Sequence, residues 1–397
     1  MAGKTHQLNE SVVIRSLRRF RERYFPNTGG AVKGDLTSAE DQGDEPQLGF
    51  LDSLPVDTQF LIMSYLCPAD ICCLGATSRY WRALVRDPLL WRYFLIRDML
   101  YWPSIDHVSM PQLELLDAPL INADESLDER EEGSDKGMEL KCDYMSEYLK
   151  SCPSCREQWL PSRPAYEVVT SFLQSLVPSA EPRYAMFGPG MEQLDVSLVT
   201  RLMRAPDVLP VSGTPQRQIN GIGSGISYLF NNQHKFNILT LYSTNRAERE
   251  RARVQQQSVN SKLFAFVGTD DSGKLIYSLA PHVQQVCQVV DGFIYVANAE
   301  PGKGEGESEI AQIRAVLSYV KASTPRPLLV LSCVAREDPD AGNRIATRWR
   351  TPCVYMAKRL GLSKLDNQWM VQDTVAESLS GLLDGIAWLL RCSGVKL

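Results

Sequence analysis

The residues best suited to chemistry in the first half of this 397-residue chain are cysteines. Cys152 and Cys155 form a CxxC pair, and Cys142 lies ten residues before it. A structural zinc site needs four ligands, which usually come from two such pairs of cysteine or histidine. The four histidines of the chain have no spacing that would complete the set: His6, His107, His234 and His282. No thioredoxin-type strand precedes the pair, so we expect neither a metal site nor a redox site there.

Phosphate binding would need a glycine-rich loop with a lysine at its end. The loop that follows the apolar run Tyr184–Phe187 reads Gly188-Pro-Gly-Met-Glu-Gln-Leu-Asp-Val-Ser197. Counted from either glycine, no lysine occupies the required place, and both registers bring acidic residues toward the phosphate. Repulsion of a single charge at 4 Å costs roughly 4 kcal/mol at an effective dielectric constant near 20. Pro189 also removes one backbone donor, so we expect no nucleotide here.

Two further glycine clusters have the wrong context for phosphate. Gly221-Ile-Gly-Ser-Gly225 precedes a predicted strand rather than opening a helix. Gly302-Lys303-Gly304-Glu-Gly306 contains a lysine but follows a predicted strand and has the composition of a loop. Backbone amides hold phosphate where a loop leads into a helix N-terminus. The sequence therefore predicts a protein that is not an enzyme and that binds no cofactor.

The elements that surround these loops alternate between strands and helices after Glu181. Continuously apolar runs predict buried strands at Tyr184–Phe187, Gly292–Ala297, Pro327–Cys333 and Trp369–Gln372. Asn231-Asn232-Gln233 predicts a hairpin turn between the strands Ile226–Phe230 and Lys235–Tyr242. Helices are predicted at Met191–Met203, Arg246–Phe264, Ile310–Val320, Cys353–Leu360 and Ala376–Leu390. This alternation predicts an α/β domain with a mostly parallel sheet covered by helices on both faces.

The order of these elements resembles that of a small GTPase, and the C-terminal part most resembles the ADP-ribosylation-factor branch. The matching residues are Leu360-Gly361-Leu362, Trp369, Gln372-Asp373-Thr374, Ala376, Leu382, Asp384-Gly385 and Trp388-Leu389. The residues that bind nucleotide in that family are absent. No Asp-x-x-Gly follows Leu241-Tyr242, and Ser332-Cys333-Val334-Ala335 occupies the place of the guanine-reading Asn-Lys-x-Asp. The resemblance implies a small-GTPase-like domain without a nucleotide site; an active switch with an unusual loop is the alternative.

The segment Leu54–Trp91 contains three short apolar helical stretches broken by proline and aspartate. Pro55 suits a first helical turn, and Asp70 is predicted to cap a helix that begins at Ile71. Phe60, Met63 and Leu66 recur at a spacing of three and form one apolar stripe. About forty residues cannot bury that much apolar surface alone. The segment therefore needs a partner or the rest of its own chain.

This segment resembles an F-box, the adaptor-docking motif of cullin-type ubiquitin ligases. The matching residues are Leu54-Pro55, Ile62, Tyr65-Leu66, Asp70-Ile71, Leu74, Ser78, Trp81, Leu84, Asp87-Pro88 and Leu90-Trp91. The resemblance implies a substrate receptor of an SCF-type (Skp–cullin–F-box) ligase, which binds the Skp adaptor and, through it, the cullin and RING subunits. The GTPase-like domain would then select the protein to be ubiquitinated. The alternatives are an F-box scaffold outside a ligase and an ordinary helical bundle.

Docking to the adaptor is expected through seven residues, some of which could belong to the core of the module instead: Leu54, Pro55, Ile62, Leu66, Leu74, Trp81 and Trp91. For the protein substrate, the hypothesis concerns Ile226, Tyr228 and Phe230. In the GTPase outline their strand lies at a sheet edge, where free amides and carbonyls can pair with another strand. An edge blunted by its own loops is the alternative. The resemblance to F-box proteins of this layout implies a telomere-repeat-binding factor and a D-type cyclin as substrate candidates.

The predicted domains are a flexible arm at 1–50, the F-box at 51–98, a helical linker at 99–165 and the GTPase-like domain at 166–397. The linker contains an acidic loop, Asp124–Glu139, whose composition predicts disorder. The fold class is thus multi-domain, with an all-α first part and an α/β second part. A helix is also predicted at Tyr166–Val177.

Charge and composition exclude several classes of protein. The net charge of −5 argues against a nucleic-acid-binding surface, although basic residues cluster at Arg15–Arg23 in a mobile arm or an amphipathic helix. No run of eighteen apolar residues occurs, so we expect no membrane span. Cysteines inside apolar runs are typical of reduced thiols, which predicts a cytoplasmic protein, with the nucleus left open. A homodimer is also left open.

Overall fold

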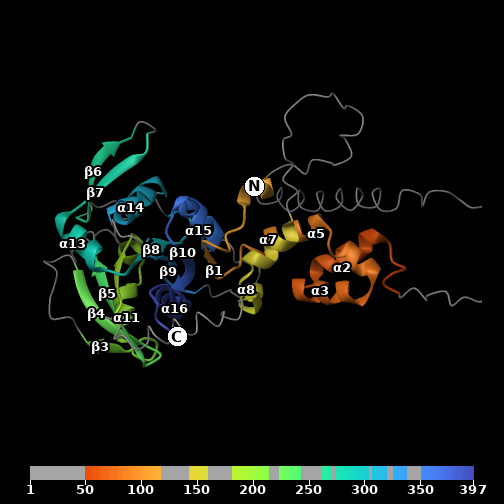
Figure 1. The fold of residues 1–397 in the computed structure, drawn as a ribbon, viewed down its shortest axis with the longest axis horizontal. Helices are drawn as coiled ribbons and strands as arrows, with labels where there is room; N and C mark the ends of the chain where they lie inside the picture. Colours follow the sequence, from red (N-terminus) through yellow and green to blue (C-terminus); the bar gives the residue numbers. More distant parts are fainter. Residues whose placement is uncertain are drawn as a thin grey trace, which may run out of the picture. The chain divides into compact units, whose positions relative to one another are not determined.

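The computed structural model describes residues 50–117, 143–159, 181–213, 223–242, 262–270, 273–303, 306–319, 325–337 and 350–397. They fall into two compact units, which are drawn in Figure 1. The first unit comprises described residues up to Arg97 together with those of 113–148, and the second comprises 98–112 and those from Leu149 onward. The predictions for the arm before residue 50, for Asp124–Glu139 and for Tyr166–Val177 lie outside the described residues. None of the described helices is both long and apolar enough to span a membrane.

The first unit is built from short helices, as the sequence predicts. They are α2 (Val56–Tyr65), α3 (Pro68–Thr77), α4 (Arg79–Leu84), α5 (Pro88–Asp98), α6 (Leu113–Asp117) and α7 (Tyr144–Ser151). Its core includes Met63, Ile71 and Phe94, all of which are fully buried. The ring centroids of Trp91 and Tyr148 lie 5.4 Å apart, so α5 packs against α7 through an aromatic pair.

Helix α3 begins earlier than predicted. Its N-cap residue is Cys67, whose thiol accepts from the Asp70 backbone N–H at 3.4 Å and donates to the Asp70 carboxylate at 2.9 Å. Asp70 is therefore a residue of the first turn, and the prediction that it caps a helix starting at Ile71 is wrong. The reason is Pro68, whose missing N–H and fixed φ suit the first helical position.

The second unit is centred on an eight-stranded sheet. The order across the sheet is β1 (Ser104–Asp106), β10 (Trp369–Val375), β9 (Leu328–Val334), β8 (Gly292–Asn298), β2 (Arg183–Phe187), β5 (His234–Leu241), β4 (Gly223–Phe230) and β3 (Val211–Gly213). The five strands from β10 to β5 are parallel, whereas β1, β4 and β3 each pair antiparallel. Every residue of β8 and β9 is buried. The prediction of an α/β domain with a mostly parallel sheet is confirmed.

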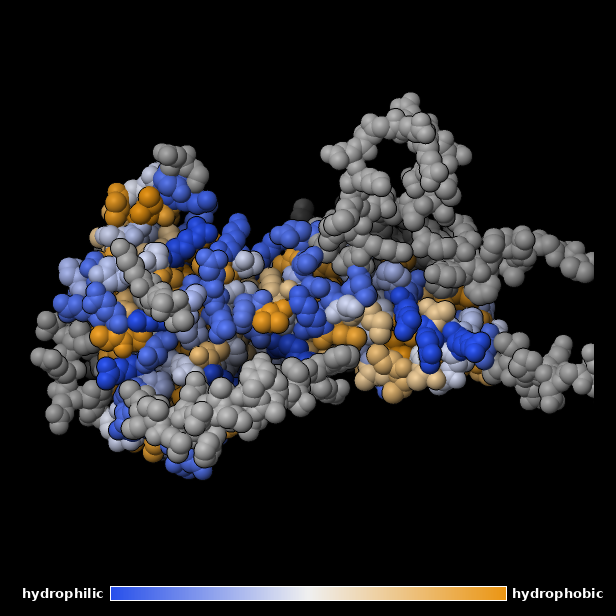
Figure 2. All heavy atoms as spheres, viewed as in Figure 1, coloured by the Kyte–Doolittle hydropathy of each residue, from blue (hydrophilic) through white to orange (hydrophobic). Residues whose placement is uncertain are grey.

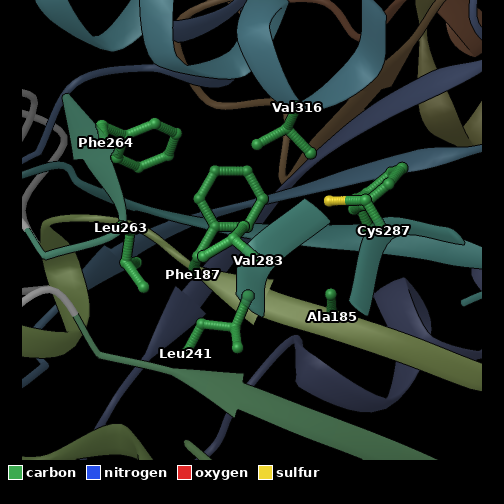
Figure 3. Close-up of a pocket in the computed structure, with 9 residues that line it drawn as sticks. Ala185, Phe187, Leu241, Leu263, Phe264, Val283, Cys287 and Val316 are labelled. Carbon is green, nitrogen blue, oxygen red and sulfur yellow. The ribbon is translucent and has the colours of Figure 1, made fainter. Parts of the chain in front are cut away.

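Helices cover both faces of this sheet (Figure 1). The helices of this unit are α8 (Pro153–Trp159), α10 (Gly190–Gln193), α11 (Leu198–Arg204), α13 (Pro281–Val289), α14 (Gly306–Tyr319), α15 (Cys353–Arg359) and α16 (Leu382–Cys392). One core cluster joins Val296 of β8 to Leu202 of α11 and Ile386 of α16. Phe187 of β2 lies among residues from α13 and α14, including Val283 and Val316 (Figure 3). The side chains around Phe187 leave no space for a water molecule.

The edges of the sheet differ from the prediction. The strand Ile226–Phe230 belongs to β4, which is not an edge strand, because β3 pairs with Ser227 and Tyr228. At the other edge, β1 comes from the predicted helical linker and pairs with β10. Arg156 of α8 forms an ion pair with Asp106 of β1, with 2.9 Å between Nη1 and Oδ2. Residues of the predicted linker are therefore part of the α/β unit.

Several element boundaries also differ. The predicted helix Met191–Met203 is two helices, α10 and α11, and Ser197 caps the second through the Thr200 N–H. The predicted helix end at Phe264 is wrong, since β6 (Phe264–Thr269) begins there and forms a hairpin with β7 (Leu275–Leu279). The turn at Asn231 and Asn232 is confirmed, with both residues at positive φ.

Helix α16 starts at Leu382 rather than at Ala376. Gly381 precedes it with φ +77°, and a Cβ there would lie 2.0 Å from the Asp373 carbonyl oxygen. A side chain is excluded from that position, so the chain turns there before the helix begins.

Candidate protein-docking groove

Helices α2, α3 and α4 line a hollow of about 310 Å³ in the first unit, which we call the α2–α3 groove. Its lining residues are Leu51, Gln59, Ile62, Met63, Leu66, Asp70, Cys73, Leu74, Thr77 and Trp81. Asp70 is the one charged residue among them. The groove therefore offers an apolar surface with few polar groups, which suits recognition rather than catalysis.

The floor of the groove is held in place by one buried amide. Gln59 is buried, and its Nε2 donates to the Leu51 carbonyl at 2.8 Å. The Tyr80 hydroxyl donates to Gln59 Oε1 at 2.5 Å. These bonds tie the turn before α2 and the start of α4 to α2 itself. A buried amide with both ends bonded rigidifies its surroundings, so the groove is largely formed before any partner binds.

The neighbourhood of the groove exposes large apolar side chains. Phe50 and Tyr65 are 79% and 83% exposed, and Leu61 and Ile62 of α2 are also exposed. Figure 2 shows the weakly hydrophobic surface of α3 in pale orange. Several large apolar side chains exposed on one helix are typical of an interaction site.

Three cysteines lie on or beside the helix α3, and the thiol of one of them, Cys72, is not an activated nucleophile. Cys67, Cys72 and Cys73 are free and exposed. Burial, followed by the neighbouring Cys73 and Cys67, raises the pKa of Cys72 above its ordinary value of 9.0. Its thiol therefore stays protonated at neutral pH, whereas a reactive cysteine needs a lowered pKa.

The glycine loop of the second unit packs directly against β8. Gly188 has φ +128°, and a Cβ there would lie 2.5 Å from the Val296 carbonyl oxygen. A Cβ on Gly190 would lie 2.9 Å from the Ala297 carbonyl oxygen. Asn298 Nδ2 donates to Gln193 Oε1 at 3.2 Å and holds α10 to the end of β8. These glycines let the loop backbone pack closely on the backbone of β8. Close packing therefore explains why glycine occupies these positions without any bound phosphate.

Two arginine–carboxylate pairs lie at the carboxyl ends of the central strands. Arg359 Nη2 lies 3.3 Å from Glu309 Oε2 and donates to the carbonyl of Asn298 in β8. Arg350 Nη2 lies 2.8 Å from Asp373 Oδ1 of β10. Ligands of open α/β sheets bind at this end of the strands, and here both guanidinium groups are held by the chain itself.

In the second pair, burial has the largest effect on the pKa of Asp373. It raises the pKa of Asp373 to about 6, while Arg350 and the hydrogen bond from the Cys353 thiol act in the opposite direction. The Cys353 thiol donates to Asp373 Oδ1 at 3.0 Å. Burial and this carboxylate raise the pKa of Cys353 well above 9.0, so the thiol remains protonated. The cluster joins α15 to β10 and offers no nucleophile.

Comparison with known proteins finds relatives that are similar over most of the chain. A protein-family model described as F-box-like matches residues 51–97, which carry the α2–α3 groove. F-box only protein 4 from Bos taurus is 48% identical over 371 residues, which cover 93% of this chain and 89% of that protein. The proteins of the same name from Homo sapiens and Mus musculus are 47% and 44% identical, over 89% and 96% of this chain and 86% and 92% of theirs. The chain belongs to the F-box only protein 4 family.

The seven residues expected to dock the adaptor lie in different surroundings in the structure. Four of the seven line the α2–α3 groove, namely Ile62, Leu66, Leu74 and Trp81. Leu54 is half-buried and Pro55 is exposed at the start of α2. Trp91 is fully buried, and its indole N–H donates to the Val85 carbonyl at 2.7 Å. Trp91 therefore belongs to the core of the unit, which is the alternative left open for these residues, and a contact between Trp91 and the adaptor stays a prediction.

Sequence reasoning missed Gln59 and the exposed Tyr65. Gln59 carries a weak signal, since it is a polar residue beside the buried Phe60 on α2. Tyr65 lies within the F-box pattern, but its exposure depends on how α2 packs. Neither property is visible from spacing alone.

The residues expected to bind a substrate do not form an exposed surface. Ile226, Tyr228 and Phe230 of β4 are buried in the core cluster, and β3 pairs with β4 at the edge of the sheet. The edge position on which this hypothesis rested is wrong, because β3 covers part of β4. The assignment of these three residues to substrate binding stays a prediction without that support.

The cysteine pair of the predicted linker is placed at the start of α8. Cys152 is buried and Cys155 is half-buried, while Cys142 lies outside the described residues. No group of three or more His, Cys, Asp or Glu among the residues that the structure describes is arranged to hold a metal ion.

Proposed function

We propose that this chain is the substrate-recognition subunit of an SCF-type E3 ubiquitin ligase. Its F-box would bind the Skp adaptor, which joins it to the cullin and RING subunits. The observation that carries this proposal is the α2–α3 groove, where Ile62, Leu66, Leu74 and Trp81 meet inside the F-box-like segment. An apolar groove beside exposed aromatic side chains is the expected form of such an interface.

The mechanism that we propose is proximity rather than catalysis by this chain. A substrate lysine held near a thioester on another subunit reacts at a raised effective concentration. The groups that the fold brings together support this reading. The Cys72 thiol, on the helix that carries groove residues, is protonated at neutral pH, and the buried carboxylate of Asp373 is engaged by Arg350 and Cys353.

We propose that the α/β unit is a small-GTPase-like domain that has lost its nucleotide site and now selects the protein substrate. The close packing of Gly188 and Gly190 on β8 supports this loss, as does the missing lysine of the loop. Titration with GDP and GTP by calorimetry, with and without Mg²⁺, tests it. Binding in the micromolar range would favour the rival function, a nucleotide-dependent switch.

The candidate substrates are a telomere-repeat-binding factor and a D-type cyclin, which would be directed to proteasomal degradation. The proposed location is the cytoplasm, with the nucleus open, and the proposed partners include no nucleic acid and no membrane. A homodimer stays open. Capture of proteins by the whole chain under proteasome inhibition, compared with a chain truncated after Pro164, tests substrate selection. Loss of the candidate substrates from the truncated chain is the expected result.

The ligase assignment is tested by co-purification of the adaptor and the cullin. The double substitution Leu54→Ala/Pro55→Ala is expected to weaken recovery of both together. Recovery of the adaptor without any cullin would favour an F-box scaffold outside a ligase.

A further inference from the structure

We infer that residues 12–25 of this chain bind its own α2–α3 groove and compete there with the adaptor. This inference rests on the proposed function, since the groove is the adaptor surface proposed above. These residues lie outside the part of the chain that the structure describes. What carries the inference is the fit between their sequence, the chemistry of the groove and the place where the described chain begins.

The segment combines apolar and basic residues in a regular pattern. Val13, Leu17, Phe20 and Tyr24 recur at spacings of four, three and four. That spacing places apolar side chains on one side of a helix, the form in which peptides bind apolar grooves. The residues between them include Arg15, Arg18, Arg19, Arg21 and Arg23.

The groove complements this pattern in shape and charge. Its volume of about 310 Å³ and its apolar lining suit a few large side chains. Its one charged lining residue is acidic, Asp70. The backbone carbonyl of Asp52 accepts a hydrogen bond from Gln59 Nε2 at 3.4 Å, so a second acidic residue lies near the floor. An arginine-bearing apolar segment thus meets acidic residues beside an apolar surface.

The connection between the segment and the groove is short. Leu51 lines the groove and the neighbouring Phe50 is exposed, so the described chain begins at the groove itself. Residues 26–49 separate the segment from this point. A random-coil chain of that many residues has a root-mean-square span of about 27 Å, so a connection of this length is long enough to reach the groove. Tethering at this range gives effective concentrations of about millimolar, so a weak contact suffices to compete.

The test is the affinity of the full chain for the purified Skp adaptor, measured by calorimetry. Leu17→Asp/Phe20→Asp and Arg18→Glu/Arg21→Glu are expected to raise the affinity about tenfold. The control Lys4→Glu/Lys33→Glu changes the net charge as much as the second variant but lies outside the segment. It should leave the affinity unchanged. Equal affinities for all four chains would overturn the inference.

A second measurement keeps this inference separate from the proposed function. A labelled peptide of residues 11–25 is added to the Leu17→Asp/Phe20→Asp chain, and its fluorescence polarisation is followed. Binding that is lost on Ile62→Glu supports the groove as its site, even if the adaptor binds none of the chains and the ligase proposal fails. Adaptor binding with no peptide binding would overturn this inference and leave the ligase proposal intact.

Discussion

The Tyr80 hydroxyl donates to Gln59 Oε1 at 2.5 Å across the floor of the α2–α3 groove. Through Nε2 the same amide donates to Leu51, so one side chain joins three segments that are separate in sequence. Because Gln59 is buried, loss of a partner leaves a polar atom without a bond in a place that water does not reach.

Removing the Tyr80 hydroxyl should loosen the groove. Tyr80→Phe leaves Gln59 Oε1 without its donor, and we expect a loss of about 1 kcal/mol in the free energy of unfolding. Denaturant unfolding followed by circular dichroism measures it. Tyr93→Phe on the exposed face of α5 is the matched control and should change little. Equal effects of the two substitutions would show that the Gln59 bond contributes nothing.

A charge inside the groove should block docking. Leu74→Asp places a carboxylate among apolar lining residues, and we expect a loss of at least about 2 kcal/mol in the binding free energy of the Skp adaptor. Cys72→Asp adds the same charge to the same helix, but Cys72 does not line the groove. Calorimetry with both variants, after a check of their circular dichroism, should show that only Leu74→Asp binds weakly. Equal weakening would place the docking surface elsewhere.

Trp91 should matter for stability and not directly for docking. Trp91→Phe removes the indole donor to Val85 and leaves a cavity among buried rings. We expect a loss of about 2 kcal/mol in the free energy of unfolding. The adaptor affinity of the folded fraction should remain within about twofold of that of the unsubstituted chain, since a core residue adds no direct contact. A large fall in affinity at low temperature, where the variant is folded, would contradict the core assignment.

Gly188 should tolerate no side chain. In Gly188→Ala the new Cβ would lie 2.5 Å from the Val296 carbonyl oxygen at φ +128°, so strain adds to a backbone clash. We expect a loss of more than about 2 kcal/mol in the free energy of unfolding. Gly273→Ala is the control, because it also has positive φ but meets nothing within 4 Å. It should cost about 1 kcal/mol. Similar losses for both would remove the argument that the loop packs tightly on β8.

Asp373 should give the stability of the α/β unit a distinct pH dependence. Its folded pKa of about 6 lies above its ordinary value of 3.8, so the folded state binds its proton more tightly. The contribution of Asp373 to stability is therefore fully present below pH 3.8 and is lost as the pH rises through 6. Ionised Asp373 is then retained by Arg350 at a desolvation cost.

The substitution Asp373→Asn removes this titration. The difference in unfolding free energy between the unsubstituted chain and the variant should fall between about pH 4 and pH 6 and be level above about pH 7. The slope is the quantity to compare, because the neutral amide also leaves the Arg350 guanidinium without its counter-charge at every pH. A difference that is constant across this range would mean that the Asp373 pKa is not raised.

Much of the fold follows from local sequence patterns. The strands β8 and β9 are apolar along their whole length, and a strand that is buried on both faces requires that composition. Asn231 and Asn232 predict their turn because asparagine tolerates positive φ. The F-box segment is likewise visible, since its apolar residues follow a family pattern over consecutive positions.

The rest depends on contacts between residues far apart in the chain. Strands β1 and β3 are only three residues long, so no periodicity reveals them, and only pairing with β10 and β4 makes them strands. The β6–β7 hairpin is not among the predicted elements, and its apolar residues Phe266, Val267 and Ile276 are exposed, so it is unlike the continuously buried strands that were predicted. A local sequence pattern does not show which edge of the sheet will pair with another segment of the chain.

The sequence by itself determined the classes of the two units and the absence of a lysine from the glycine loop. Tertiary structure alone decided which apolar residues face outward. Ile62 is exposed and lines the α2–α3 groove whereas Trp91 lies in the core, although both match the same F-box pattern. The physical reason is that hydrophobicity sets only the free energy gained when a side chain leaves water. The packing of α5 on α7, and of α2 on α3 and α4, decides which neighbours surround that side chain.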